Sequence, residues 1–300
     1  MVLRLKITPR CAACILYART RELEKVLEDV NEQIAYFSSL LEAVQLYFVP
    51  EAELTGLAVM SFKRLLSMVG SNPYDKEKAK VFSLALERAE AVRDLVEGAR
   101  DVNARFRLAL SASAMASRLE AHMFKYEPPS HVEVLAAKLS KDDTSKLLEM
   151  LSKGGYTIYY LPASIGELPY DYIVLDLLKE NFDVRIVALV RQEPYMDYVT
   201  IDDVGEVDLE DHVDEVISYP SATLAKDEAS ELYERFAEPK SIVLVKGLLQ
   251  SLYMANNPPA GLVFAVFQAY CDVAVKVFNT GLNSLNALIL HEPQEYHTRS

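Results

Sequence analysis

The spacing of the apolar residues changes near residue 155, and this change constrains the fold more than any other feature of the sequence. Before it, apolar residues recur every three or four positions, as on one face of a helix. After it, short β-rich runs alternate with helical segments, which is typical of parallel βαβ units. The sequence therefore predicts an α/β protein. A helical N-terminal half (residues 1–153) should pack on a three-layer α/β/α Rossmann-like sandwich (residues 154–300) with a mainly parallel sheet.

The same patterns give the expected elements. In the first half, one continuous apolar face over residues 23–48 predicts a helix ended by Pro50, and no strand of the main sheet is expected before residue 150. The further predicted helices cover residues 51–68, 75–97, 102–124, 140–152, 168–181 and 226–236. The predicted strands cover residues 156–161, 184–190, 213–219, 241–245 and 262–267.

Composition narrows the classes of function. The net charge of −13 argues against nucleic-acid or acidic-membrane binding, because both need a basic face. The chain has no apolar run of signal-peptide length at its start, and its longest apolar stretches, such as 260–269, are about half a membrane span. Three cysteines are too few for a disulfide framework. We therefore expect a cytoplasmic protein.

Ligands of parallel α/β sheets bind at the carboxyl ends of the strands, so the loops after Leu161, Val190 and Val245 are the expected site. The first loop reads Pro-Ala-Ser-Ile-Gly-Glu, and an aspartate follows four residues after the glutamate. The second reads Arg-Gln-Glu-Pro-Tyr-Met-Asp-Tyr-Val-Thr and the third Lys-Gly-Leu-Leu-Gln. In this order they resemble the motifs of the metal-dependent damage-control phosphatases, which are Asp-Asn-Ala-Gly-Glu with a later Asp, Asn-Asp-x-Thr, and Lys-Gly-x-x-Asn.

Shorter segments extend this resemblance over nearly the whole chain. They are Cys11-Ala-Ala-Cys14, Pro73-Tyr74 with Lys78, Leu108–Ser113, and Ala269-Tyr270-Cys271. The resemblance implies a phosphatase fold whose metal is held by the Asp and Asn of the first loop and the Asp of the second.

The departures from the family pattern fall on the implied metal site. The three implied metal-ligand positions hold Ala163, Ser164 and Tyr198. An implied Asn and Asp of the helical segment are Ser113 and Ala116, and an implied lysine is Tyr270. Alanine has no ligand atom, and hydroxyls are poor ligands for Mg²⁺ or Mn²⁺. We therefore expect no bound metal and no other cofactor. If the protein is active, a divalent Mn, Co, Ni or Mg ion is expected.

Other positions keep functional side chains and form the candidate ligand-binding set: Gly166, Glu167, Asp171, Arg191, Asp197, Thr200, Lys246 and Gly247. Arg191 and Lys246 would face a phosphate or carboxylate. Three acidic members, Glu167, Asp171 and Asp197, would hold a cation in a shifted site. The alternative for Glu167 and Asp171 is a structural role at a helix N-terminus, and for Lys246-Gly247 a strand-end turn.

The cysteines leave several possibilities open. Cys11, Cys14 and Cys271 would form one thiol cluster if the N-terminus folds back on the late α/β segment, as the resemblance implies. The pair Cys11 and Cys14 would then be redox-active or part of a zinc site. The alternative is thiols that are simply buried at the start of a helix.

Three functions remain compatible with these residues. The first is a non-catalytic, phosphatase-like protein that binds a small phosphorylated metabolite or a protein partner. The second is a working metal-dependent phosphatase of small phosphorylated metabolites with relocated ligands. The third is an interaction subunit whose helical half forms an oligomer interface. Tyr198 and Tyr270 are bulkier than the residues they replace, so the first function predicts a smaller or more apolar pocket at the strand ends.

Overall fold

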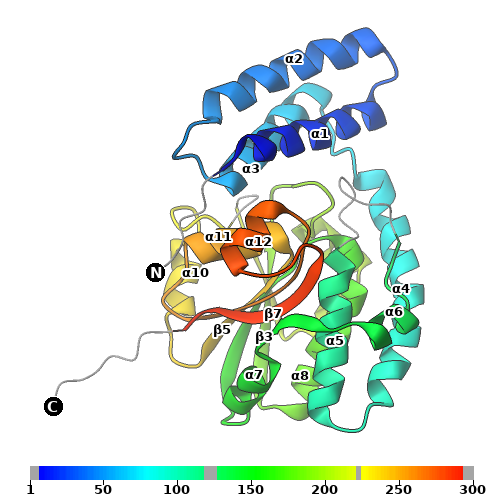
Figure 1. Ribbon diagram of the computed structural model, residues 1–300, viewed down its shortest axis with the longest axis vertical. Helices are drawn as coiled ribbons and strands as arrows, with labels where there is room; N and C mark the ends of the chain where they lie inside the picture. Colours follow the sequence, from blue (N-terminus) through cyan, green and yellow to red (C-terminus); the bar gives the residue numbers. More distant parts are fainter. Residues whose placement is uncertain (1–6, 118–126, 221–223, 293–300) are drawn as a thin grey trace, which may run out of the picture.

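The computed structural model describes residues 7–117, 127–220 and 224–292, and it has the three-layer α/β architecture expected from the sequence (Figure 1). The strand order is β1-β7-β6-β5-β2-β3-β4. Neighbouring strands from β6 to β4 are parallel, whereas β7 is antiparallel to β6. The strands are β1 (Leu139–Asp142), β2 (Tyr156–Leu161), β3 (Val184–Arg191), β4 (Glu215–Tyr219), β5 (Ser241–Lys246), β6 (Leu262–Ala269) and β7 (Ser284–His291).

Alternate residues of the central strands face opposite helical layers, because successive side chains of a strand point to opposite faces. On one face Ile158 and Tyr160 pack in a core with helices of the first half of the chain. On the other face Tyr159 and Leu161 pack with late helices. The first layer contains α4 (Asp75–Glu97), α5 (Val102–Ala116), α7 (Thr144–Leu151) and α8 (Leu168–Asn181); the second contains α10 (Ser230–Phe236), α11 (Leu248–Asn256) and α12 (Asp272–Phe278).

Three N-terminal helices form a separate layer above the strand ends (Figure 1). They are α1 (Pro9–Val26), α2 (Val30–Tyr47) and α3 (Leu54–Val69). Their core also contains Ala163, Tyr195, Met196 and Tyr198 from the strand-end loops. The helical layer therefore covers the edge of the sheet at which the sequence places the functional site.

Three expectations about the first half are wrong. The predicted helix over 23–48 is two helices, α1 and α2, because the chain leaves the helix at Leu27 and Asp29 caps a new one by accepting from the Asn31 N–H. The predicted helix over 140–152 begins only at Thr144. Leu139–Asp142 form β1, an edge strand of the main sheet paired with β7, so the expectation that no strand of this sheet precedes residue 150 is wrong as well.

The packing is continuous across residue 153, because α4 and α5 share their core with the sheet. The division into domains at 1–153 and 154–300 stays a prediction. Residue 124, the expected end of the helix predicted over 102–124, lies outside the described residues; the observed α5 ends at Ala116. In the described part of the chain, none of the helices is both long and apolar enough to cross a membrane.

Candidate functional site

The predicted loops meet at the point where the strand order reverses. From β2 the chain continues to β3 and β4 on one side, and then crosses to β5 and β6 on the other. The carboxyl ends of β2 and β5 therefore flank the switch point, which is where open α/β sheets bind ligands. The first loop leaves β2 and the third leaves β5, so these two predicted loops lie at the switch point.

Lys246 is the centre of the buried polar cluster at this point. It is the last residue of β5 and is 2% exposed. Its Nζ lies 3.3 Å from Glu167 Oε2 and 3.2 Å from Asp171 Oδ1, and it donates to the Ser113 carbonyl at 2.8 Å. One ammonium group thus lies between two carboxylates, and three bonding partners surround it.

The two carboxylates reach Lys246 because the sequence places a short helical turn and then a helix directly after β2. Glu167 ends the turn η2 (Ile165–Glu167), and Asp171 lies in the first turn of α8. Asp171 also accepts from Tyr160 (2.6 Å) and from Ser113 Oγ (2.7 Å). Glu167 Oε2 accepts from Ser117 Oγ at 3.2 Å, whereas Glu167 Oε1 has no hydrogen-bond partner among the described residues.

Burial dominates the protonation of this cluster. It raises the pKa of Glu167 to about 7, an effect that the Lys246 ammonium opposes. Burial also raises the pKa of Asp171, again against Lys246 and the Tyr160 hydrogen bond. The pKa of Tyr160 rises well above its usual range, first through burial and then through Asp171. Near pH 7 the Glu167 carboxyl is therefore partly protonated beside the single ammonium group of the cluster.

Asp197 belongs to a neighbouring group of contacts. Its Oδ2 accepts from Ser164 Oγ at 2.7 Å, and Ser164 also pairs with Tyr198 across an isolated β-bridge. Gly166 donates its N–H to Ser164 Oγ at 3.3 Å. Ser164 thus holds the first and second loops together through its hydroxyl.

Arg191, at the end of β3, is 1% exposed. Its guanidinium lies 4.5 Å from the ring centroid of Tyr198, and its Nη1 donates to the Pro162 carbonyl at 3.3 Å. Thr200 forms a β-bridge with Arg191, and both its N–H and its hydroxyl donate to Asp203. Arg191 and Lys246 are therefore both engaged inside the protein.

The remaining predicted positions divide between the core and the cavity beside it. Ala163 and Ala116 are fully buried apolar residues, and Tyr270 is half-buried on the cavity wall. Gly247 adopts φ 77°, ψ 158°, which is essentially restricted to glycine, and starts α11. It thus makes the strand-end turn, and its N–H donates to Val266 O.

A divalent cation does not fit this arrangement. Mg²⁺ requires oxygen ligands at about 2.0–2.1 Å in near-octahedral geometry. Here the space between Glu167 and Asp171 contains the Lys246 ammonium, and Asp197 is bonded to Ser164 instead. Over the described ranges, no group of three or more His, Cys, Asp or Glu residues has a metal-binding arrangement. Glu167, Asp171 and Asp197 therefore do not form the predicted shifted metal site in this structure.

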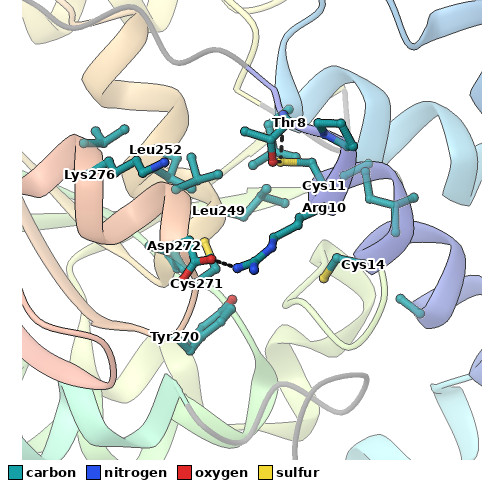
Figure 2. Close-up of a pocket in the computed structure, with 18 of the residues that line it drawn as sticks. Thr8, Arg10, Cys11, Cys14, Leu249, Leu252, Tyr270, Cys271, Asp272 and Lys276 are labelled. Carbon is teal, nitrogen blue, oxygen red and sulfur yellow. Dashed lines mark hydrogen bonds and ion pairs between the residues drawn. The ribbon is translucent and has the colours of Figure 1, made fainter.

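The three cysteines line one cavity, as expected if the N-terminus folds back on the late α/β segment. Within the described residues, none of the three forms a disulfide bond. Cys11 is buried and makes hydrogen bonds to Thr8, whereas Cys14 is exposed (Figure 2). Cys271 caps α12 by accepting from the Ala274 N–H. Among the described residues, these thiols do not form a group of three or more metal-binding side chains, so the structure does not support a zinc site here.

Sequence reasoning missed a second buried group, in which Arg19 and Glu22 of α1 meet Tyr74. Arg19 Nη1 lies 3.0 Å from Glu22 Oε2, and the Tyr74 hydroxyl donates to Glu22 at 2.8 Å. Burial raises the pKa of Glu22 to about 7 against the effect of Arg19. An Arg-x-x-Glu pair within a helix is usually solvent-exposed, so no local signal marks it. Asp203 was also missed, although the Thr-x-x-Asp spacing from Thr200 resembles a capping box.

Comparison with known proteins agrees with this geometry. An uncharacterized protein of Methanocaldococcus jannaschii is 24% identical over 277 residues, which cover 89% of this chain and 90% of that protein. The crystal structure of a DUF89 family protein from Pyrococcus horikoshii has the same fold, with a TM-score of 0.80 at 18% identity over 96% of this chain and all of that one. Residues 7–285 match the damage-control phosphatase ARMT1-like domain. Because this match includes the three strand-end loops, the chain belongs to the damage-control phosphatase ARMT1-like family.

Proposed function

We propose that this chain is a non-catalytic member of its family, which recognises a ligand without hydrolysing a phosphate ester. The observation that carries the proposal is the position of Lys246, whose ammonium group lies between Glu167 and Asp171. A fixed internal cation neutralises the two carboxylates that a shifted metal site would need. Unlike a metal ion, it is tied to β5 and cannot bridge to a substrate oxygen.

The residues around Lys246 support the same conclusion. Phosphoryl transfer depends on positioning and on neutralising the charge that develops in the transition state. The implied metal-ligand position Ala163 offers no donor atom, and the Tyr198 ring stacks on Arg191. The implied lysine is Tyr270, which brings no positive charge. Loss of one well-placed electrostatic group costs about 100- to 1000-fold in rate, and this chain lacks several.

The ligand is better accommodated in the adjoining cavity than at the buried cations. A phosphorylated metabolite would have to reach Arg191 and Lys246, which are 1% and 2% exposed and already bonded to protein groups. The cavity, by contrast, lies open between the helical layer and α11–α12. A protein partner could also bind over the opening of this cavity.

A metal-dependent assay tests the proposal. The purified chain is assayed with p-nitrophenyl phosphate and a set of small sugar phosphates, each with Mn²⁺, Co²⁺, Ni²⁺ or Mg²⁺. We expect no metal-stimulated turnover. Turnover that disappears in Asp197→Ala, a variant that keeps Lys246 in place, would show that the metal ligands have moved and that the enzyme is active.

A further inference from the structure

A cavity with a volume of about 1110 Å³ lies between α1 and α3 on one side and α11 and α12 on the other (Figure 2). Its walls are mainly aliphatic and aromatic, and Leu249, Leu252, Val273 and Val277 form one side. Ligand sites commonly have volumes of about 300–1,000 Å³ and apolar walls with a few polar groups. The cavity therefore has the size and character of a small-molecule site.

The charged side chains on the cavity wall are mainly cationic. Four charged side chains line it, and three are cationic: Arg10, Arg19 and Lys276, against Asp272. Arg10 forms an ion pair with Asp272 across the opening (Figure 2), and Arg19 forms one with Glu22, so among the described lining residues the remaining charge is that of Lys276. This local excess of positive charge contrasts with the net charge of −13 for the whole chain.

The two cations lie at different depths. Arg19 is 1% exposed, and its Nη1 forms the 3.0 Å ion pair with Glu22 behind the wall; its Nε makes no hydrogen bond within the described structure. Lys276 is exposed on α12 near Leu252 (Figure 2). An anionic group near the opening would therefore meet the Lys276 ammonium first.

The lining also argues against a sugar or a nucleotide. Such ligands present many hydroxyl and phosphate oxygens, and each one buried without a hydrogen bond is costly. Only a few lining side chains, among them Thr8, Tyr195 and Tyr270, offer neutral hydroxyl groups. A single charged group on an otherwise apolar body matches the wall better.

We propose that the cavity binds an apolar molecule carrying one anionic group, such as an aliphatic monocarboxylate, with its chain against Leu249 and Leu252 and its carboxylate near Lys276. The inference deepens the proposed non-catalytic function, because it names the class of ligand that the chain recognises. Binding in the cavity does not depend on the buried cluster around Lys246, so the two proposals can fail separately.

Binding is measured with a reporter that the sequence makes available. The chain contains no tryptophan, so Leu282→Trp places a single indole at the 57%-exposed position on the rim of the cavity. Decanoate and decyltrimethylammonium, which share a tail but carry opposite charges, are titrated into this variant. Calorimetry on the unmodified chain provides a second measurement that does not rely on the reporter.

We expect decanoate to bind at least roughly tenfold more tightly than the cationic amphiphile. In the reporter background, Lys276→Glu should weaken decanoate binding by roughly threefold to tenfold, which corresponds to reversing one partly exposed charge. Lys153→Glu is the matched control, since Lys153 is exposed and does not line the cavity. It should change the affinity by less than about twofold.

Equal affinity for the two amphiphiles, or equal losses in Lys276→Glu and Lys153→Glu, would overturn the assignment of an anionic ligand. No binding of either compound would overturn the assignment of the cavity as a binding site. Phosphatase activity of the same preparation is assayed in parallel. Activity together with selective decanoate binding would refute the non-catalytic function and leave this inference standing.

Discussion

Replacing Lys246 by methionine removes the only ammonium that contacts Glu167 and Asp171 among the described residues. Both carboxylates are at most 1% exposed, so neither can be rehydrated without opening the core. Removing one partner of a buried ion pair costs about 3–5 kcal/mol, which is a large fraction of a total stability of about 5–15 kcal/mol. We therefore expect Lys246→Met to lower the free energy of unfolding by about 3–5 kcal/mol at pH near 8.

The loss should depend on pH in a defined direction. Burial has already raised the pKa of Glu167 to about 7, and removal of the ammonium raises it further. Protonation of the carboxylates therefore relieves part of the loss as the pH falls. The neutral combination Lys246→Met, Glu167→Gln, Asp171→Asn should recover most of it, because no uncompensated charge remains buried.

Urea unfolding followed by circular dichroism at pH near 6 and near 8 measures both effects. Lys153→Met, which replaces an exposed lysine, is the control and should stay within about 0.5 kcal/mol of the parent. If Lys246→Met lost less than about 1 kcal/mol near pH 8, the ammonium would not be compensating the two carboxylates, and the reasoning would be refuted.

Three further predictions concern the surroundings of the site. Burial raises the pKa of Glu22 and of Glu167 to about 7 from 4.5, so the stability that each contributes is complete below pH 4.5 and is lost as the pH rises through about 7. Glu22→Gln or Glu167→Gln should each flatten the fall in unfolding free energy measured between those pH values, and an unchanged slope would contradict the assignment. Gly247→Ala should lower stability by about 1–3 kcal/mol, because alanine is strained at φ 77°, ψ 158°; an unchanged melting temperature would show that the turn relaxes. Tyr74→Phe removes the 2.8 Å hydrogen bond to Glu22 and should cost about 1–3 kcal/mol, while Tyr17→Phe, at an exposed tyrosine, should be neutral.

The elements predicted best are those with strong periodicity and clear local boundaries. The helices at 75–97 and 168–181 and the strand at 156–161 have the expected limits. The break between α1 and α2 was missed because the apolar spacing runs through it, and no Gly or Pro marks residues 27–29. Strand β1 was missed because it is a four-residue, mostly polar segment stabilised by pairing with β7 (Ser284–His291), a distant strand that was not predicted either.

The location of the candidate site could be predicted, but its contacts could not. The three loops meet as expected because parallel strands end at one edge of the sheet. The contact of Lys246 with two carboxylates depends on how α5 and α8 pack over β5, which no local pattern encodes. The sequence likewise shows Tyr198 as a lost metal ligand, whereas only the tertiary structure shows its ring stacked on Arg191.

The central claim is that the Lys246 ammonium takes the place of a divalent cation between Glu167 and Asp171. Calorimetric titration of Mn²⁺ into the metal-free chain tests it most directly, with Asp197→Ala as the matched variant. The account predicts no saturable binding in either protein. One Mn²⁺ bound per chain with micromolar affinity, and lost in Asp197→Ala, would contradict it.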